Sequence, residues 1–450
     1  MKTTTKKAPP IASHEAISST LWDLVVIGGG PAGMMAAGRA AEKAHEEKRA
    51  TKILLLEKNA GLGKKLLITG GGRCNVTNAE TDTRKLLSRF KDSDKFLFSA
   101  FAQYGVTETL GFFHAHNMPT KVEAEKRVFP ESNTARSVWN VMTGYLSGKG
   151  RDGANPVTVH SNAQVSSFIQ TKPGTIDAVK LKTGEVIRGR SFILATGGKS
   201  HPETGSTGDG FAWLTKTGHT VAEPRAALVP VTVSDTWVKK LSGFSLPEAK
   251  LTLFLDGVKV TGKQAVKKGK VLFTHFGLSG PAVLNMSSEI RDLLAYGDVR
   301  ISLDLLPAHD YATLNAALQK LFTEQSNKKF KNALADLIPS SLVPAVVEKS
   351  AILPDTFCNS VTREERLNLV KVSKDMRITP TGLLGDDKAI ITSGGVALNE
   401  IDWKTMRSRL ISNLHIIGDM LDIDRPSGGY SLQLCWTTGW VAGNAAGLAT

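Results

Sequence analysis

Short apolar runs that end in glycine recur along the chain, and they predict buried strands followed by turns. The first run, residues 24–27, leads into a glycine-rich turn at residues 28–33. An alanine-rich stretch from residue 34 to about residue 47 has the character of a helix, and a second apolar run at residues 52–56 follows it. Strand, turn, helix and second strand in this order are typical of the βαβ unit of an α/β protein.

The glycines of the first turn have the spacing of a dinucleotide site, Gly28-x-Gly30-x-x-Gly33. The first glycine makes the tight turn, the second lets the backbone approach a pyrophosphate, and the third allows close packing of helix on strand. The helix N-terminus adds free N–H groups and a positive partial charge. Glu57 lies 24 residues after Gly33, near the spacing of an acidic group that bonds an adenosine ribose. The dinucleotide-binding residues expected here are Gly28, Gly30, Pro31, Ala32, Gly33, Glu57 and Lys58.

A second glycine-rich stretch follows at residues 61–78. Its three consecutive glycines, residues 70–72, expose backbone N–H groups where a flat or charged ligand could lie against the chain. The residues expected to line a ligand in this stretch are Lys64, Lys65, Gly71, Gly72, Arg73 and Asn75. Cys74 lies among them, and it could be a proton donor, a reactive thiol or a small packing residue.

Two later apolar runs end in the same way. Residues 191–194 emerge into Ala-Thr-Gly-Gly, and residues 413–417 end at Gly418 and Asp419, whose carboxylate is suited to bonding a sugar-alcohol hydroxyl. Glycines before the last predicted helix, residues 432–446, aim N–H groups at an electron-rich ligand. The further binding residues expected from these segments and from a strand at residues 163–169 are Val165, Ala195, Thr196, Gly197, Gly198, Gly418, Asp419, Gly428, Gly429, Tyr430 and Ser431.

The middle of the chain has a different pattern. From about residue 229, apolar and polar residues alternate in short segments that predict a small β domain, and helical segments follow. We expect a disordered leader (1–20), a discontinuous nucleotide-binding domain (21–228 and 376–450), an inserted β domain (229–306) and a helical cap (307–375). Within the insertion, His275 lies in a shaped turn, where it could be a substrate-facing acid or base or a structural histidine.

The chain is basic, with 56 Lys and Arg against 42 Asp and Glu and a net charge of +14. Between Lys239 and Lys270 there are eight lysines against only Glu248 and Asp256. Such a concentration favours a polyanionic partner such as nucleic acid, although a solvated basic surface would look the same.

Composition argues against several other classes. The three cysteines do not have the number and spacing of a disulfide framework. No metal site is predicted, because neither the cysteines nor the pair His114 and His116 have further ligand residues at metal-binding spacing. No apolar run approaches the roughly 20 residues that span a bilayer, and the polar N-terminus does not resemble a signal peptide. We therefore expect a cytoplasmic protein without a membrane partner, and the pattern specifies no oligomeric state.

Together these segments resemble the BaiN/RdsA family of NAD(P)/FAD-dependent oxidoreductases over about residues 21–447. The most specific pieces are residues 63–75, 273–281 and 418–433. The resemblance implies a Rossmann-like FAD-binding domain of the α/β class, with an inserted domain that is β-barrel-like and then helical. It also implies FAD in the first site and NADH or NADPH as a transient electron donor. Asp419 stands where family members often have Glu, and Ser431 where they often have Asn.

The chemistry that the resemblance implies is hydride transfer from reduced flavin N5 to an electron-poor C=C bond. Related enzymes reduce conjugated steroid enones, or reduce a uridine of large-subunit ribosomal RNA to dihydrouridine. The basic balance favours ribosomal RNA as the substrate here, with the stretch from Lys239 to Lys270 as the contact surface. A small conjugated enone is the alternative substrate. A flavin-bearing RNA-binding or assembly factor that needs no turnover is an alternative of another class.

Overall fold

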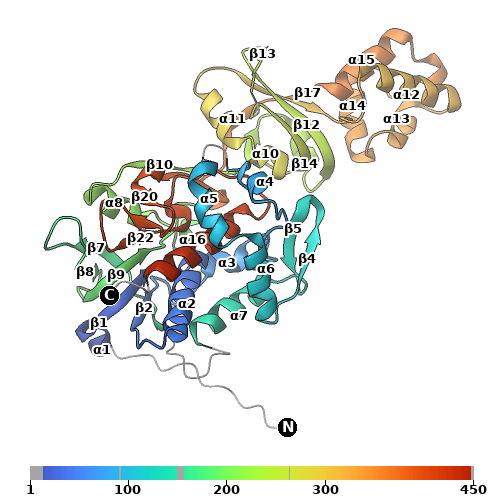
Figure 1. The fold of residues 1–450 in the computed structure, drawn as a ribbon. Helices are drawn as coiled ribbons and strands as arrows, with labels where there is room; N and C mark the ends of the chain where they lie inside the picture. The colour runs from blue at the N-terminus through green and yellow to red at the C-terminus, as the bar shows by residue number, and fades with distance from the viewer. Residues whose placement is uncertain (1–13, 91–92, 149–156, 263, 447–450) are drawn as a thin grey trace. The chain divides into compact units, whose positions relative to one another are not determined.

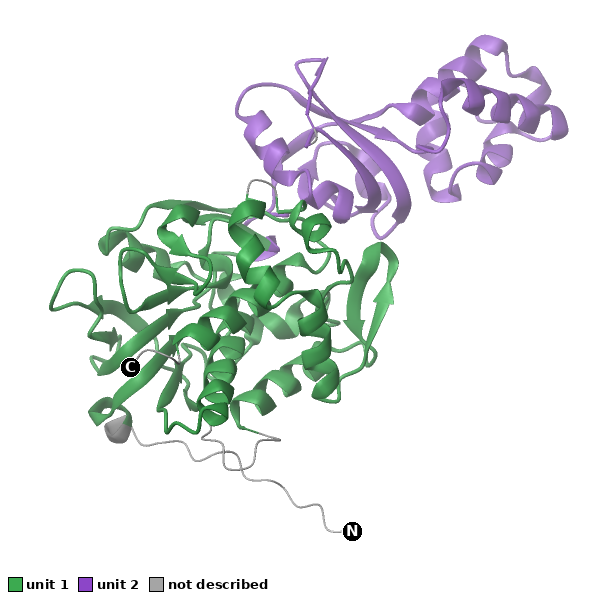
Figure 2. Ribbon diagram, in the orientation of Figure 1, with its two compact units in different colours: residues 1–226, 391–450 green, residues 227–390 purple. Residues whose placement is uncertain are grey.

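The computed structural model describes residues 14–90, 93–148, 157–262 and 264–446. The chain divides into two compact units, Met1–Ala226 with Ile391–Thr450 (unit 1) and Ala227–Ile390 (unit 2), which Figure 2 distinguishes by colour. Among the described residues, no helix has the length and apolar character needed to cross a membrane.

Unit 1 is built on a nine-stranded sheet. Its strands are β1 (Leu21–Ile27), β2 (Ile53–Leu56), β6 (Thr158–His160), β7 (Val165–Ile169), β8 (Ala178–Leu181), β9 (Val186–Leu194), β20 (Ile401–Asp402), β21 (Arg407–Ser408) and β22 (Leu414–Ile416). The path runs β20-β21-β22-β9-β1-β2-β6, with the β7–β8 hairpin added beside β9. From β22 to β6 the pairing is parallel, and Val25 of β1 lies opposite Leu54 of β2 and Phe192 of β9. These strands confirm the predicted apolar runs, because parallel strands covered on both faces read as continuous hydrophobic segments.

Two helices close one face of this sheet, α2 (Pro31–Glu46) and α16 (Tyr430–Ala446), and Figure 1 shows them side by side. Their contact depends on small residues. A Cβ added to Gly439 would lie 2.5 Å from the Ala32 carbonyl oxygen, and one on Gly443 would lie 2.3 Å from that of Ala36. The C-terminal helix therefore packs directly against the helix that follows the first glycine turn.

The remaining elements of unit 1 surround this framework. The helices are α1 (His14–Ser19), α3 (Lys64–Ile68), α4 (Thr83–Leu87), α5 (Asp94–Gln103), α6 (Val106–Ala115), α7 (Ala135–Leu146) and α8 (Asp209–Lys216). Two small sheets join β3 (Thr77–Asn78), β5 (Arg127–Pro130) and β4 (Thr120–Glu123), and β10 (Val221–Ala227) with β19 (Ile391–Val396).

Unit 2 contains an eight-stranded sheet in which every described pairing is antiparallel. Its strands are β11 (Val231–Val233), β12 (Ser245–Leu255), β13 (Val258–Lys259), β14 (Val266–Phe273), β15 (Gly277–Ser279), β16 (Val299–Asp304), β17 (Met376–Ile378) and β18 (Pro380–Leu383). The path β17-β16-β12-β14-β15-β11-β18 has two ends among the described residues, with β13 added beside β12. The insertion expected to be barrel-like is thus an antiparallel sheet.

The helices of unit 2 are α9 (Thr236–Lys240), α10 (Pro281–Leu284), α11 (Ser287–Leu294), α12 (Tyr311–Glu324), α13 (Phe330–Ala333), α14 (Val343–Ser350) and α15 (Arg363–Lys374). Apolar side chains of α12–α15 join one buried cluster with the inner side of the sheet, to which Leu251, Leu253 and Ile301 belong. The sheet and the helical part therefore share a core.

Two predicted boundaries need correction. The nucleotide-binding domain was expected to resume at residue 376, but β17 pairs with β16 and β18 pairs with β11, so residues 376–383 complete the inserted sheet. Unit 1 resumes at Ile391 instead. Of the leader expected over residues 1–20, residues 1–13 lie outside the described residues, whereas His14–Ser19 form α1. Ile17 is buried there, and Trp22 Nε1 donates a hydrogen bond to its carbonyl oxygen at 3.1 Å.

Candidate dinucleotide site

The turn between β1 and α2 has the backbone that the glycine spacing predicts. Gly28 adopts a φ of 109°, and a Cβ there would lie 2.4 Å from the Ala195 carbonyl oxygen. A Cβ on Gly33 would lie 1.9 Å from the Gly28 carbonyl oxygen, so this glycine is required for close packing inside the protein. A Cβ on Gly30 would meet no atom within 4 Å, so the backbone here faces open space at the helix N-terminus.

Glu57, at the end of β2, holds the neighbouring loops together. One carboxylate oxygen accepts a hydrogen bond from the Gly29 N–H at 2.8 Å, and the other accepts from the Asn59 backbone N–H at 2.8 Å and from Asn59 Nδ2 at 2.7 Å. A carboxylate has about four lone-pair sites, two on each oxygen, so only the oxygen that accepts from Gly29 can accept a further bond from a ligand hydroxyl. The predicted ribose contact thus stays a prediction, and the structure adds a second task for this side chain.

A cavity with about 920 Å³ of empty space lies along the carboxyl ends of β1, β2, β9 and β22. It brings together many residues predicted from six separate segments: Gly28, Gly30, Pro31, Ala32, Glu57, Lys58, Lys64, Lys65, Val165, Ala195, Thr196, Gly197, Gly418 and Asp419. The carboxyl edge of a doubly wound sheet is the place where such folds bind ligands.

The other predicted binding residues are not in the lining of this cavity: Gly33, Gly71, Gly72, Arg73, Asn75, Gly198, Gly428, Gly429, Tyr430 and Ser431. Several of them have contacts that account for them within the protein. A Cβ on Gly198 would lie 2.1 Å from Thr392 Oγ1, and one on Gly429 would lie 2.3 Å from the Thr77 carbonyl oxygen. The Arg73 guanidinium pairs with Glu123 and lies 4.2 Å from the centre of the Phe129 ring.

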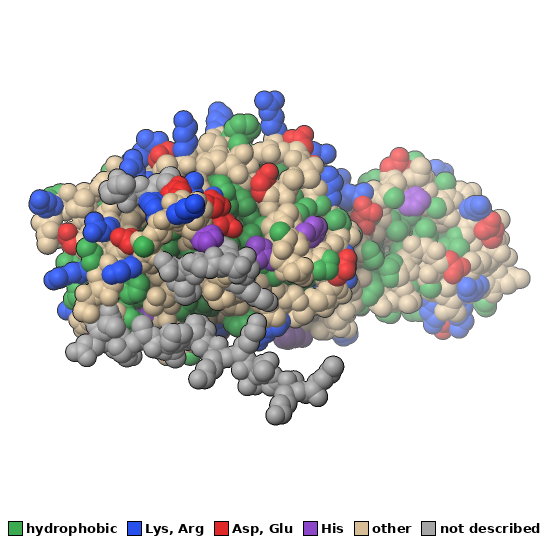
Figure 3. All heavy atoms as spheres, turned by 60° about the horizontal axis from the view of Figure 1, so that its bottom comes forward, with side chains coloured by type: hydrophobic (Ala, Val, Ile, Leu, Met, Phe, Trp, Pro, Cys, Tyr) green, Lys and Arg blue, Asp and Glu red, His purple; other side chains and the backbone are tan. Residues whose placement is uncertain are grey.

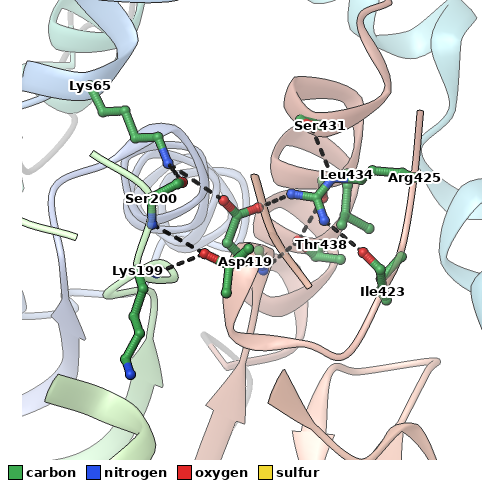
Figure 4. A network of polar contacts seen from close by, with 11 residues as sticks. Lys65, Lys199, Ser200, Asp419, Ile423, Arg425, Ser431, Leu434 and Thr438 are labelled. Carbon is green, nitrogen blue, oxygen red and sulfur yellow. Dashed lines mark hydrogen bonds and ion pairs between the residues drawn. The ribbon is translucent and has the colours of Figure 1, made fainter. Parts of the chain in front are cut away.

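Asp419 belongs to a buried network that the sequence did not reveal (Figure 4). One of its carboxylate oxygens accepts a hydrogen bond from Arg425 Nη2, and Lys65 Nζ lies 3.9 Å from the other. The Arg425 side chain has no exposed surface, and it also donates to Ser431 Oγ at 3.0 Å and to the Ile423 carbonyl at 2.8 Å. Thus Ser431, predicted as a cofactor contact, helps to hold the arginine that holds Asp419.

Lys65 donates to Ser200 Oγ at the other side of Asp419 (Figure 4). Burial lowers the pKa of the Lys65 ammonium, and the nearby Asp419 carboxylate opposes this effect. The cavity therefore has a lysine and an aspartate side by side, with the aspartate anchored from behind by a buried arginine.

The loop at residues 204–209 also lines the cavity, although its sequence did not suggest a nucleotide fold. Lys58 Nζ reaches this loop and donates to Thr207 Oγ1 at 2.6 Å and to Asp209 Oδ2 at 3.1 Å. Its glycines, Gly205 and Gly208, were the available signal, because both have positive φ.

Cys74, Cys435 and His275 lie in three different environments. Cys74 is fully buried outside the cavity lining, and burial raises the pKa of its thiol to about 12, which argues against a proton donor. Cys435 belongs to the buried core and also lines the cavity, and burial raises the pKa of its thiol to about 12 as well. His275 lies exposed in unit 2, next to the Phe276 ring.

The residues present fit a dinucleotide cofactor. A pyrophosphate matches the open space before Gly30, the N–H groups at the start of α2 and the cationic side chains of Lys64 and Lys65. The attached ribose matches the acidic side chain of Glu57. We expect the pyrophosphate at the N-terminus of α2.

Comparison with known proteins agrees with this geometry. The model of the HI0933-like protein Rossmann domain matches residues 22–445. The chain is 28% identical to a 3-dehydro-bile acid delta(4,6)-reductase of Clostridium scindens, over 94% of this chain and 98% of the relative. It is also 28% identical to a ribosomal RNA dihydrouridine synthase of Escherichia coli, over 93% of this chain and 96% of the relative.

Among solved structures, the 3-ketosteroid delta1-dehydrogenase of Sterolibacterium denitrificans is similar in fold. It has a TM-score of 0.51 and 12% identity, and the match covers 96% of this chain and all of that one. With the family model matching nearly the whole chain, the protein belongs to the HI0933-like Rossmann-domain family of FAD-dependent oxidoreductases.

Proposed function

We propose that this enzyme uses NADH or NADPH to reduce an electron-poor C=C bond, and that its substrate is a uridine of large-subunit ribosomal RNA. The observation that carries the proposal is the cavity at the carboxyl edge of the parallel sheet, where the Gly28–Gly30 turn, Glu57, Lys65 and Asp419 meet. Bound flavin would supply the hydride-transfer chemistry.

The residues of this chain bind and orient the cofactor. The N–H groups at the start of α2 stabilise a pyrophosphate, and Glu57 accepts from a ribose hydroxyl. Asp419, fixed by Arg425, accepts from a hydroxyl of the sugar-alcohol chain. In the overall reaction uridine C5=C6 gains a hydride and a proton, and NADH or NADPH is oxidised to NAD⁺ or NADP⁺.

Charge favours the RNA substrate over a small molecule. The relatives act on a bile acid or on ribosomal RNA, and both are 28% identical to this chain, so identity does not choose between them. The net charge of +14 and the eight lysines between Lys239 and Lys270 favour a polyanionic substrate. On the face shown in Figure 3, lysine and arginine side chains are spread over the surface with acidic ones among them.

A small conjugated enone is the second candidate, because the Clostridium scindens relative is a bile acid reductase. Its reaction and uridine reduction are chemically related, since both saturate a C=C bond conjugated to a carbonyl. A flavin-bearing RNA-binding or assembly factor without turnover is the candidate of a different class.

Three measurements separate these functions. Purified protein should be yellow with a flavin spectrum, and stopped-flow mixing with NADH and NADPH should bleach it with at least one donor. Absence of bleaching with either would favour the factor without turnover. Deleting the gene should remove a dihydrouridine from the large-subunit ribosomal RNA of the host. An unchanged RNA mass spectrum in a host that has this modification would refute the RNA substrate.

A further inference from the structure

The antiparallel sheet of unit 2 has one apolar side and one cationic side. Residues directly opposite each other on paired strands, and alternate residues along one strand, share a side of a sheet. Lys250 of β12 lies opposite Lys268 of β14, and Phe254 lies opposite Lys259 of β13. Leu251 and Leu253, which lie between them on the other side, are buried in the core of the unit.

We define the basic face as Lys250, Phe254, Lys259, Lys268, Lys270 and Arg377. Lys270 belongs to this face because it follows Lys268 by two residues on β14. Thr252 lies between Lys250 and Phe254 on the same side of β12, Ser302 lies opposite Thr252, and Arg377 lies opposite Ser302, so Arg377 shares that side. All four lysines are exposed. Lys250 lies opposite Lys268 on β14 and opposite Asp304 on β16, and Asp304 itself pairs with Lys374 at 2.7 Å.

Acidic side chains neutralise only part of this face. Lys268 Nζ pairs with Glu248 at 2.7 Å and Arg377 Nε pairs with Asp375 at 2.6 Å. Among the described residues, no ion-pair partner is found for Lys250, Lys259 or Lys270. Three free cations on one side of a sheet form an electrostatic footprint for a phosphate chain.

The same face holds a stacking group. The Arg377 guanidinium carbon lies 3.7 Å from the centre of the Phe254 ring, and the Arg377 side chain is 40% exposed. Unpaired bases stack on aromatic rings and on arginine guanidinium planes, and sheets that bind single-stranded RNA combine such groups with surrounding cations. An aromatic–arginine stack surrounded by lysines therefore fits unpaired RNA better than it fits a duplex or an acidic protein.

We propose that the basic face docks unpaired segments of the RNA substrate, with lysines on the phosphates and the Phe254–Arg377 pair against a base. This inference rests on the RNA form of the proposed function. It places recognition on the inserted unit and leaves the reduction itself to the cofactor site of unit 1.

The test compares two triple variants of the full-length holoenzyme. In the face variant, Lys250→Gln, Lys259→Gln and Lys270→Gln remove the three unpaired cations. In the control variant, the exposed Lys320, Lys328 and Lys371 of the helical part of unit 2 are replaced by Gln, which changes the net charge equally. A labelled oligouridine and a transcript of large-subunit ribosomal RNA serve as probes across a salt series, with RNA duplex and anionic vesicles as comparators.

We expect the face variant to bind oligouridine more weakly and with a log–log salt slope smaller by about 2, since each phosphate contact contributes about 0.7 for single strands. Bleaching of the flavin by NADH or NADPH should stay unchanged in both variants. A third variant, Phe254→Leu, should weaken binding at every salt concentration while the salt slope stays the same.

Each outcome is decisive. Equal RNA binding by the face and control variants, with wild-type activity on RNA retained, would refute the docking surface and leave the proposed function standing. No RNA binding or RNA reduction by the wild-type protein would refute both. Loss of binding to vesicles or duplex, with oligouridine binding intact, would also overturn the assignment.

Discussion

The buried pair of Arg425 and Asp419 allows a quantitative test of how the cofactor site is held. Replacing Arg425 by Met keeps much of its volume and removes a cation that donates to Asp419, Ser431 and Ile423. Asp419 would then keep only Lys65, at 3.9 Å. Breaking a buried ion pair from one side costs about 3–5 kcal/mol, because a buried charge is left uncompensated. We expect Arg425→Met to lower the free energy of unfolding of unit 1 by this amount.

The second part of the test removes both charges. If the cost comes from the uncompensated carboxylate, Asp419→Asn in the Arg425→Met background should restore part of the lost stability, and the part that is not restored includes the loss of the Asp419 counter-charge by Lys65. Arg225→Met is the matched control, because Arg225 pairs with Glu223 at 2.6 Å on the surface of unit 1. Exposed pairs contribute about 1 kcal/mol or less.

Urea denaturation followed by tryptophan fluorescence is the assay. Six of the seven tryptophans, all except Trp237, belong to unit 1, so the signal follows that unit. All proteins are compared without FAD, because ligand binding adds to apparent stability by an amount that depends on the Kd of each variant. A loss below about 1 kcal/mol for Arg425→Met, no larger than that of the exposed control, would refute the reasoning.

Three further predictions concern the glycine turn and the buried thiol of Cys74. Gly30→Ala should change the free energy of unfolding of the apoprotein by less than about 0.5 kcal/mol and weaken FAD binding by about tenfold. Gly33→Ala should lower the free energy of unfolding of the apoprotein by about 2 kcal/mol or more. Equilibrium unfolding and flavin titration distinguish the two variants. Cys74→Ala should retain full turnover with NADH or NADPH, because its thiol is buried outside the cavity lining, and a large loss of kcat at unchanged flavin content would contradict this. Since folding raises the Cys74 pKa from 9.0 to about 12, its contribution to stability is present below pH 9 and is lost between pH 9 and 12. Between pH 9 and 12, the free energy of unfolding measured in urea should fall less steeply with pH in Cys74→Ala than in the wild-type protein, by about 1.4 kcal/mol per pH unit. Equal slopes in the two proteins would show that the thiol ionises in the folded state.

The parts of the fold that the sequence predicted are those in which burial leaves a continuous pattern. Residues 24–27, 53–56 and 192–194 are apolar throughout because both faces of their strands are covered. The boundary at residue 376 was wrong because short strands such as β17 carry no mark of which sheet they join. Which strand another strand pairs with depends on contacts between residues far apart in the sequence, and a single sequence does not show these contacts.

The same limit applies to the site. Glycines serve both ligand approach and close packing, and only the surroundings decide between them: Gly30 faces open space, whereas Gly429 lies against the Thr77 backbone. Arg425 was missed because an arginine six residues after Asp419 reads as a surface cation until the turn between them places it in the interior. The positions with a fixed spacing motif were therefore found, and their supporting contacts were not.

The position of α16 has a consequence for the order in which the protein forms on the ribosome. Unit 2 is one continuous stretch, whereas unit 1 is completed only by residues 391–450. Until Leu414–Ile416 is synthesised, β9 keeps an unpaired edge, and until α16 emerges, the alanines of α2 lack the glycines that cover them. Domains fold as units during synthesis, so the inserted unit can form first while the flanking half waits with an open strand edge, the kind of surface that invites aggregation. The cofactor cavity, which residues 417–419 and Cys435 help to line, is therefore complete only after these last elements have formed.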